Sequence, residues 1–540
     1  MATPERAKEL TALAVDLASL TLSPDQLCDL ELLLNGAFAP LAGYHARADY
    51  ESVLELQRLG SGRPWPLPIC LDVDASVRAR LEPGALLALR DQEGFMLAVL
   101  NVEDIWRPDP RREARLVYGT DDPGAHPGVD KFLAATGEFY LGGRVEGLHA
   151  PFHFDYRELR LAPGAARGLF ARKGWSKALG FTCSRAPQCA DERMLLDAAG
   201  RAGAKILLFS PVSQSLLGNP EHFTRVRCCK RFIERFPGDL AALVLAPLRV
   251  RAAGPRQALL EAIVHANYGC THTLIDERRL DPFGESGQIP FYAPGETLAA
   301  MAGPAREIGI APVSPEQEAY PEETFLGAAA LKRRLDFDEP VPARCLLPEI
   351  EAELRRAYPP RSGQGFTVFI TGLSGAGKST LAKLLYVKFM ELGDRPVSLL
   401  DGDIVRKNLS SELTFSQEHR FLNIKRIGFV AGEITKNRGI AICAPIAPYR
   451  DARRAAREQV EAYGGFIEVY LSTPLAVCER RDRKGIYAKA RAGKMTGVTG
   501  IDAPYEPPQA AEIVLDTTAC DVIETARRVI DYLAENRYLA

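Results

Sequence analysis

The sequence predicts a multidomain α/β protein in which a β-rich N-terminal domain precedes a Rossmann-like α/β domain and a C-terminal P-loop domain with a parallel, doubly wound sheet. Its 540 residues suit three or four domains, at roughly 150 residues for each. Short apolar runs broken by Gly and Pro come first, and apolar strands alternating with longer helical patterns follow. We therefore expect domains at residues 1–170, 171–335 and 365–540, with a proline-rich connector at residues 336–364.

Composition and charge argue against several classes of protein. The chain carries 67 Lys and Arg against 69 Asp and Glu, a formal charge of −2, so general nucleic-acid binding is not expected. It contains no stretch near the ~20 apolar residues of a membrane helix, and its first residues lack the apolar core of a signal peptide. Its 11 cysteines include no CxxC pair, which favours buried reduced thiols. We expect a cytoplasmic protein without a nucleic-acid or membrane partner.

Each of the first two domains follows from its own pattern. In residues 1–170 the runs PLPICLDV, GALLALRD and GFMLAVLNV are expected strands. From residue 171 the expected buried strands KILLFSPV and LAALVLAPL alternate with the expected helical stretches ERFPGDLAA and RQALLEAIVHAN. That alternation is typical of a parallel sheet covered by helices.

The C-terminal domain contains five expected strands separated by helical segments: FTVFITG, PVSLLDGD, GIAICAPI, FIEVYLS and EIVLDT. Such spacing is typical of a doubly wound sheet. Between the first strand and an apolar-periodic helix lies Gly372-Leu-Ser-Gly-Ala-Gly-Lys-Ser379, which satisfies the pattern G-x-x-x-x-G-K-[ST]. A chance glycine-rich turn is the alternative, and the flanking strand and helix argue against it.

This loop predicts a nucleoside triphosphate site. Its glycines allow consecutive backbone N–H groups to surround a phosphate at the positive end of a helix. Lys378 would reach the β- and γ-phosphates, and the Ser379 hydroxyl would hold Mg²⁺ together with water molecules. The predicted ATP-binding residues are Gly372, Ser374, Gly375, Ala376, Gly377, Lys378, Ser379 and Thr380.

Three features after the loop point to a second substrate. Asp401 and Asp403 end the second strand, where a carboxylate could orient an acceptor hydroxyl, although a solvated, capped turn is the alternative. Arg420 and Asn423 lie at helical spacing and can share a face, as in any polar helix face. Residues 479–494 hold seven basic and two acidic side chains around a glycine. They predict a lid over polyanions or, alternatively, an exposed charged helix.

Taken together, the C-terminal motifs resemble the adenylyl-sulfate kinase (APS kinase) family. The matching segments over residues 365–540 are GLSGAGKST, LLDGDIVR, FSQEHRFLNIKRIGFVA, APYRDAR, KGIYAKARAG and TGIDAPYEPP. The resemblance implies phosphorylation of the 3′-hydroxyl of adenosine 5′-phosphosulfate by ATP with Mg²⁺, where Asp403 orients or deprotonates that hydroxyl and Lys378 and Ser379 complete the catalytic set. It also implies that Phe415 stacks on adenine and that adenylyl sulfate is held by Asp403, Arg406, Phe415, Arg420, Asn423, Ile446, Ala447, Lys484, Gly497 and Val498.

Two positions depart from that family. Members often read SPYR where this chain reads APYR from Ala447 onward. Because Ala447 has no hydroxyl, we expect direct in-line transfer from ATP rather than a phosphoserine intermediate. The second aromatic clamp of the family is Val498 here, so one face of the adenine sandwich should be weaker by about 0.5–1.5 kcal/mol.

Residues 1 to about 345 resemble ATP sulfurylase in the framework motifs NGAFAPLAGY, DQEG, YGT, HPGV and NYGCTH. The active-site motifs do not match. Where that family has Q-x-R-N-P-x-H-x-x-H this chain has TCSRAPQCAD, and the family's G-R-D loop becomes DER. The degenerate positions are Thr182, Arg185, Gln188, Asp191, Asp276 and Glu277.

These substitutions remove cationic and hydrogen-bonding groups where sulfate must approach an α-phosphate, and they add carboxylates there. We therefore expect an inactive sulfurylase-like domain that serves as a scaffold in a homo-oligomer, with nucleotide sensing as the alternative role. Three functions stay open: APS kinase alone, a bifunctional enzyme that also has sulfate adenylyltransferase activity, and a regulatory protein whose P-loop only senses ATP. The TGID segment argues against a gluconate- or nucleoside-type kinase, and the lack of N-K-x-D argues against a GTPase.

Overall fold

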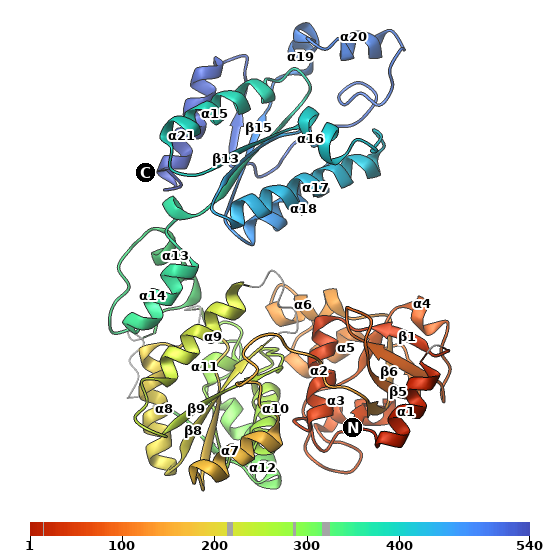
Figure 1. Ribbon diagram of the computed structural model, residues 1–540, viewed down its shortest axis with the longest axis vertical. Coiled ribbons are helices and arrows are strands. Elements are labelled where there is room, and N and C mark those ends of the chain that lie inside the picture. The colour runs from red at the N-terminus through yellow and green to blue at the C-terminus, as the bar shows by residue number, and fades with distance from the viewer. Residues whose placement is uncertain (15, 213–219, 285–287, 316–324, 540) are drawn as a thin grey trace. The chain divides into compact units, whose positions relative to one another are not determined.

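The computed structural model describes residues 1–14, 16–212, 220–284, 288–315 and 325–539, with the backbone but not the side chains of residues 220 and 403. The chain divides into two compact units, residues 1–332 with 340–357 and residues 333–339 with 358–540 (Figure 1). The expected connector at residues 336–364 is thus shared between the units, and its helix α14 (Pro348–Ala357) belongs to the first. Within the described ranges, no helix is both long and apolar enough to cross a membrane.

The first unit begins with a mixed sheet of six strands in the order β1-β4-β5-β6-β2, and β3 pairs with β6 beside this path. β1 and β4 run parallel, and the other pairs are antiparallel. The three expected apolar runs form β3, β4 and β5, and helices pack around the sheet. The elements are α1 (Pro4–Leu13), β1 (Ala18–Thr21), α2 (Pro24–Asn35), β2 (Gly43–Tyr44), α3 (Arg47–Leu56), β3 (Leu71–Val73), α4 (Ala75–Arg78), β4 (Leu86–Arg90), β5 (Met96–Trp106), α5 (Pro110–Tyr118), α6 (Pro127–Ala135) and β6 (Phe139–Gly147).

A second, wholly parallel sheet follows in the order β11-β10-β7-β8-β9. The expected strands KILLFSPV and LAALVLAPL form β8 and β9. The expectation of a helix over ERFPGDLAA is wrong: the preceding helix ends at Ile233, because Pro237 and Gly238 turn the chain into β9. The elements are α7 (Pro163–Lys173), β7 (Ala178–Thr182), α8 (Cys189–Ala202), β8 (Lys205–Pro211), α9 (Pro220–Ile233), β9 (Ala241–Ala246), α10 (Gly254–Asn267), β10 (His272–Leu274), α11 (Glu277–Leu280), α12 (Glu296–Ile308), β11 (Ala311–Val313) and α13 (Ala328–Asp336).

The second unit is a parallel sheet in the order β13-β14-β12-β15-β16, and its strands are the five expected ones. Helices α15 and α21 cover one face and α17 and α18 the other (Figure 1). The elements are η3 (Arg361–Gly363), β12 (Phe366–Gly372), α15 (Lys378–Leu392), β13 (Val397–Asp401), α16 (Gly402–Leu409), α17 (Gln417–Lys436), β14 (Ile440–Ala444), α18 (Arg450–Glu461), β15 (Gly465–Leu471), α19 (Leu475–Arg481), α20 (Ile486–Arg491), β16 (Ile513–Leu515) and α21 (Val522–Glu535).

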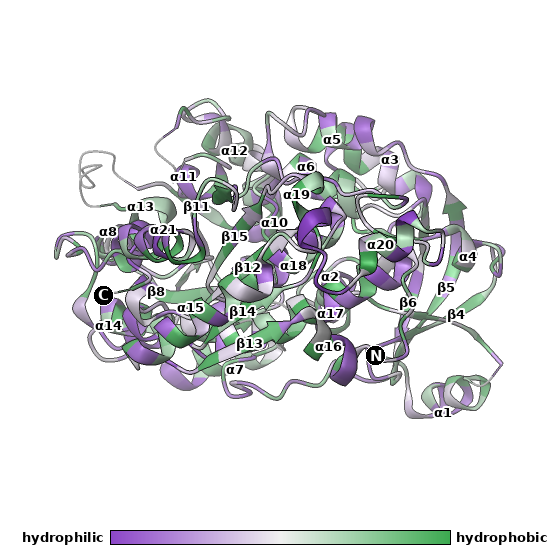
Figure 2. Cartoon of the chain, turned by 90° about the horizontal axis from the view of Figure 1, so that it is seen from above, coloured by the Kyte–Doolittle hydropathy of each residue, from purple (hydrophilic) through white to green (hydrophobic). Residues whose placement is uncertain are grey.

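The central strand β12 fixes the position of the glycine-rich loop. Every residue of β12 is buried, and the strands of this sheet are coloured largely hydrophobic in Figure 2. As the middle strand, β12 carries the loop at the carboxyl edge of the sheet. Gly372 has φ of +146°, and a Cβ there would lie 2.7 Å from the carbonyl oxygen of Leu471. Gly377 has φ of +105° directly before α15. These two positions require glycine because a side chain would clash or strain the backbone.

Candidate active site

A cavity of about 940 Å³ opens at the carboxyl edge of the C-terminal sheet. Its walls come from the segments that follow β12, β13, β14 and β16 together with α17, residues 481–486 and residues 495–499. Because all five strands are parallel, their carboxyl ends meet at this edge. Doubly wound sheets bind their ligands in this place.

Most of the residues expected to bind ATP or a second substrate line this one cavity. They are Ser374, Gly375, Gly377, Lys378, Ser379, Thr380, Arg406, Phe415, Arg420, Asn423, Ile446, Ala447, Lys484, Gly497 and Val498. Two expected residues of the loop do not contribute to the wall: Gly372 ends β12, and Ala376 is fully buried. Asp403 lies in the first turn of α16, directly after the lining residues Asp401 and Gly402, and its side chain lies outside the described residues.

The glycine-rich loop is held in shape by side chains from outside it. The carbonyl groups of residues 374–376 accept hydrogen bonds from the Tyr487 hydroxyl at 2.9 Å, from Arg481 Nη1 at 3.4 Å and from Thr517 Oγ1 at 3.1 Å. Lys378 is buried and donates from Nζ to a carbonyl of its own loop at 2.7 Å. Protein contacts therefore hold the backbone of the loop.

Arg420 connects helix α17 to the opposite wall. Its guanidinium donates from Nε to the carbonyl of Phe415 at 2.8 Å, from Nη1 to Thr499 Oγ1 at 2.7 Å and from Nη2 to the carbonyl of Gly497. One turn further along α17, Asn423 is buried, and its Oδ1 has no hydrogen-bond partner among the described residues. The expected shared face of Arg420 and Asn423 therefore exists and lines the cavity.

Phe415 presents an aromatic surface at the mouth of this site. Its side chain is 60% exposed, and the guanidinium carbon of Arg406 lies 4.2 Å from the ring centroid. Val498, the expected weaker clamp, is buried in the hydrophobic core that supports the loop. The aromatic stacking surface of the cavity is thus on the Phe415 side.

The charge of the cavity wall is strongly positive. Among the described side chains three lining residues are acidic, namely Asp401, Asp482 and Asp521, whereas seven are basic: Lys378, Lys383, Arg406, Arg420, Arg481, Arg483 and Lys484. Such an excess concentrates anionic ligands. The basic segment 479–494 contains the end of α19 and the short helix α20, with Gly485 at φ of +65° between them, and it contributes three of these cations.

Sequence reasoning missed the wall formed by residues 517–525. Thr517, Cys520, Asp521 and Thr525 line the cavity after β16, although EIVLDT was expected only as a strand. The position of that strand in a parallel sheet was a usable signal, because residues after its carboxyl end must lie at the ligand-binding edge.

The degenerate sulfurylase positions in the first unit are engaged in contacts with their own chain. Arg185 forms a bidentate ion pair with Asp191, with Nη1–Oδ2 and Nη2–Oδ1 distances of 2.6 and 3.0 Å. The side-chain amide of Gln188 donates to the carbonyl of Leu326 at 2.7 Å and accepts from its N–H at 2.9 Å. Thr182 Oγ1 lies 3.1 Å from Nε2 of the buried His265.

The other two added carboxylates, Asp276 and Glu277, also have structural partners. Asp276 caps α11 by accepting from the backbone N–H of Arg278 at 3.2 Å. Glu277 accepts from the N–H groups of Gly295 and Leu298, at 2.7 and 3.1 Å, beside the start of α12. In the described part of the chain, no group of three or more His, Cys, Asp or Glu side chains is arranged to hold a metal ion.

Fold and site together define a P-loop nucleotide-binding domain attached to a larger α/β unit. The family model for adenylylsulphate kinase matches residues 364–516, the model for ATP-sulfurylase matches residues 157–357 and the model for a PUA-like domain matches residues 1–150. Sulfate adenylyltransferases of Phaeosphaeria nodorum and Emericella nidulans are 39% and 38% identical to the chain and cover 97% and 99% of it, at 95% and 96% of their own length.

A solved structure described as a hexameric APS kinase from Thiobacillus denitrificans has a TM-score of 0.77 and 36% identity, and the match covers 100% of this chain and 97% of that one. The chain therefore belongs to the sulfate adenylyltransferase family and carries an adenylylsulphate kinase domain at its C-terminal end. Both resemblances drawn from the motifs are confirmed.

Proposed function

We propose that the C-terminal unit transfers the terminal phosphoryl group of ATP to the 3′-hydroxyl of adenosine 5′-phosphosulfate. The observation that carries the proposal is a single positive cavity which joins the glycine-rich loop to Arg420, Asn423 and the exposed ring of Phe415. Its volume lies near the top of the range of roughly 300–1,000 Å³ typical of ligand pockets.

In this proposal different residues of the cavity bind ATP and the acceptor nucleotide. Lys378, at the start of α15, neutralises the β- and γ-phosphates. Asp403 holds or removes the proton of the acceptor hydroxyl from the first turn of α16. The phosphosulfate end of the acceptor is held by Arg406, Arg420, Ile446 and Lys484. Asn423 also contacts the acceptor, because its Oδ1, which has no partner among the described residues, can accept a hydrogen bond from a hydroxyl group. Phe415 stacks on the adenine of the acceptor.

Mg²⁺ fits the donor set of this site. The Ser379 hydroxyl and the Asp401 carboxylate both line the cavity, and oxygen ligands supplemented by water are those that Mg²⁺ prefers. When bound, the ion would neutralise charge on the transferring phosphoryl group. Ser379 is the residue we assign to its coordination.

Transfer is direct in this proposal, because the position after Ile446 is an alanine. Ala447 is 1% exposed and offers no oxygen that could accept a phosphoryl group. After reaction with γ-labelled ATP and denaturation, no radiolabel should therefore remain bound to the protein. Label retained on the peptide that contains Ala447 would contradict this route.

The first unit has no sulfurylase activity in this proposal and serves as a scaffold. Arg185, the remaining cation of the motif, is paired with Asp191, and Gln188 is bonded to the backbone of Leu326. Loss of one transition-state donor commonly costs about 10²–10³ in rate. The alternative is a bifunctional enzyme, which the name and full-length match of the relatives favour. Formation of ATP from adenylyl sulfate and pyrophosphate at ordinary rates would support it.

The decisive test of the kinase is release of ADP with and without adenylyl sulfate. Stimulation that depends on adenylyl sulfate, with phosphate recovered on the 3′-oxygen, is the expected result. Equal ATP hydrolysis in both cases would instead support an ATP-sensing regulatory protein. Mass measurement in solution tests a second expectation, that the chain forms a homo-oligomer, which the description of the Thiobacillus denitrificans structure as hexameric supports.

A further inference from the structure

Ala447 has a backbone conformation that alanine seldom adopts. Its φ is +45°, in the left-handed region, and its side chain is buried. It belongs to the segment 445–448, which follows β14 and lines the cavity. Left-handed backbone is unfavourable for a residue with a Cβ and persists only where the surroundings impose it. Some part of the fold must therefore hold this segment against its own preference.

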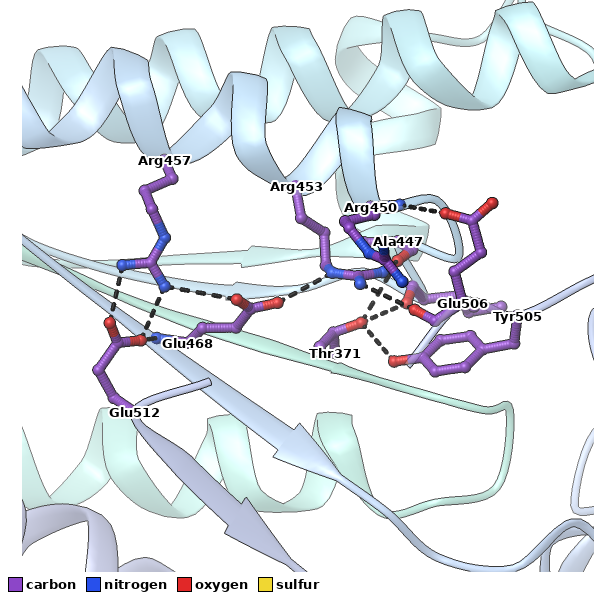
Figure 3. Close-up of polar contacts among 10 residues, drawn as sticks. Thr371, Ala447, Arg450, Arg453, Arg457, Glu468, Tyr505, Glu506 and Glu512 are labelled. Carbon is purple, nitrogen blue, oxygen red and sulfur yellow. Dashed lines mark hydrogen bonds and ion pairs between the residues drawn. The ribbon is translucent and has the colours of Figure 1, made fainter. Parts of the chain in front are cut away.

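Two side chains hold the carbonyl groups of this segment (Figure 3). Arg453 Nη1 donates to the carbonyl of Ala447 at 2.7 Å. Thr371 Oγ1 donates to the carbonyl of Ile446 at 2.7 Å and lies 2.9 Å from the Tyr505 hydroxyl. The carbonyl groups of Ile446 and Ala447 are thus held by side chains of two different elements, β12 and α18.

Arg453 is the centre of this arrangement. It projects from α18, is 3% exposed, and forms an ion pair with Glu468 of β15 through Nε at 2.9 Å. Its Nη2 donates to the carbonyl of Glu506 at 2.8 Å. One planar guanidinium therefore joins the cavity segment, a central strand and the chain after residue 500. A lysine ammonium could not meet all three acceptors at once.

A second arginine balances the buried charge. Arg457, one turn along α18, contacts Glu468 at 3.4 Å and pairs with Glu512 at 2.7 and 2.8 Å. Glu512 also accepts from the backbone N–H of Glu468 at 2.7 Å. The alternating chain of two arginines and two glutamates, drawn in Figure 3, keeps Glu468 fixed and thereby fixes Arg453.

We infer that Arg453 is a positioning residue for the acceptor nucleotide, which acts by holding Ile446 and Ala447 in the conformation that lines the cavity. This inference rests on the proposed function, in which Ile446 contacts adenylyl sulfate, and Ala447 lines the same cavity beside it. Arg453 acts through the backbone of the segment, because its side chain is buried and does not line the cavity, whereas it donates to the carbonyl of Ala447. Loss of Arg453 should weaken the binding of adenylyl sulfate and leave the binding of ATP nearly unchanged.

The test replaces Arg453 by lysine, which keeps the charge. The Arg453→Lys enzyme should show a KM for adenylyl sulfate at least tenfold higher, with the KM for ATP within twofold of the wild type. Arg454→Lys is the matched control, because Arg454 lies on the same helix with a side chain 68% exposed, and it should leave both values unchanged. Thr371→Val removes the hydroxyl group that donates to the carbonyl of Ile446, and it should also raise the KM for adenylyl sulfate.

Glycine at position 447 separates positioning from general damage. Because glycine adopts positive φ without strain, the double variant Arg453→Lys with Ala447→Gly should recover several-fold in KM for adenylyl sulfate. If the loss of Arg453 only destabilised the fold, the Arg453→Lys variant would unfold at a lower temperature without a change in its KM for adenylyl sulfate. The added glycine would then not improve that KM. An unchanged KM in both Arg453→Lys and Thr371→Val, or no recovery in the double variant, overturns the inference.

The outcomes for the inference and for the kinase itself are distinct. Calorimetric titration with adenylyl sulfate and with ADP gives affinities that do not depend on turnover. A wild type that binds adenylyl sulfate without phosphorylating it refutes the proposed reaction, whereas Arg453→Lys still tests positioning through the affinity. A wild type that neither binds nor phosphorylates adenylyl sulfate overturns both.

Discussion

Arg420 offers the sharpest test of the proposed acceptor site, through the substitution Arg420→Lys. The arginine makes three hydrogen bonds to Phe415, Gly497 and Thr499, and the residue is 8% exposed. A lysine ammonium can reach one of these acceptors, so two charge-assisted bonds are lost. Each such bond contributes about 1.5–3 kcal/mol, and water entering the site offsets part of the loss.

We therefore expect a net loss of about 3 kcal/mol in the stabilisation of the site that binds adenylyl sulfate. At about 1.4 kcal/mol for each tenfold change, kcat/KM for adenylyl sulfate should fall about 100-fold. The KM for ATP should change little, because the glycine-rich loop is held by Tyr487, Arg481 and Thr517 and not by Arg420.

The assay is ADP release at saturating ATP with adenylyl sulfate varied over its full binding curve. Lys425→Ala is the control, because Lys425 is exposed on the same helix. Thermal unfolding of both variants shows whether the fold is intact. If Arg420→Lys retains kcat/KM for adenylyl sulfate within threefold of the wild type while its fold is intact, the reasoning is refuted.

Three further predictions follow from other contacts. Ser379→Ala should lower kcat about 100-fold at saturating Mg²⁺ and preserve ADP binding by calorimetry, and chelation of Mg²⁺ should abolish turnover; an unaffected kcat would exclude Ser379 as the ligand. Burial raises the pKa of Glu113 from 4.5 to about 7 despite hydrogen bonds from two tyrosine hydroxyls. The folded state then holds this proton more tightly than the unfolded chain, so burial of the carboxyl costs stability as pH rises from about 4.5 to 7. Glu113→Gln should accordingly be more stable than the wild type at pH 8, by up to about 3 kcal/mol, and lose this advantage below pH 4.5; an advantage independent of pH would contradict the shift. Gln188→Ala should destabilise the first unit by about 1–3 kcal/mol through the lost bonds to Leu326 and leave kinase turnover intact. Urea unfolding followed by tryptophan fluorescence measures both stabilities, since the three tryptophans of the chain all lie in the first unit.

The elements of the fold that could be predicted from sequence are those specified by short stretches of chain. The five C-terminal strands follow from apolar, β-branched runs, and the glycine-rich loop follows from a contiguous pattern whose glycines meet their steric requirement within a few residues. The prediction of a helix over ERFPGDLAA is wrong because Pro237 and Gly238 form a turn there, and these two residues interrupt a helix whatever residues flank them.

The roles of the degenerate positions show where sequence reasoning stops. Asp276 and Glu277 were expected as carboxylates that repel an anionic substrate. In the structure, their oxygens accept hydrogen bonds from backbone N–H groups beside α11 and α12. Helix capping depends on which N–H groups the fold brings near, and Glu277 reaches residues 18 and 21 positions away.

The sequence by itself determined the phosphate-binding loop, the parallel order of strand and helix and therefore the edge of the sheet at which ligands bind. Only the tertiary structure decided that Arg420 joins Thr499 across 79 residues, that Arg185 is paired with Asp191, and that Arg453 holds a left-handed Ala447. The physical reason is that a local pattern fixes backbone conformation, whereas the partner of a buried charge is whichever acceptor the packed chain places within hydrogen-bond distance.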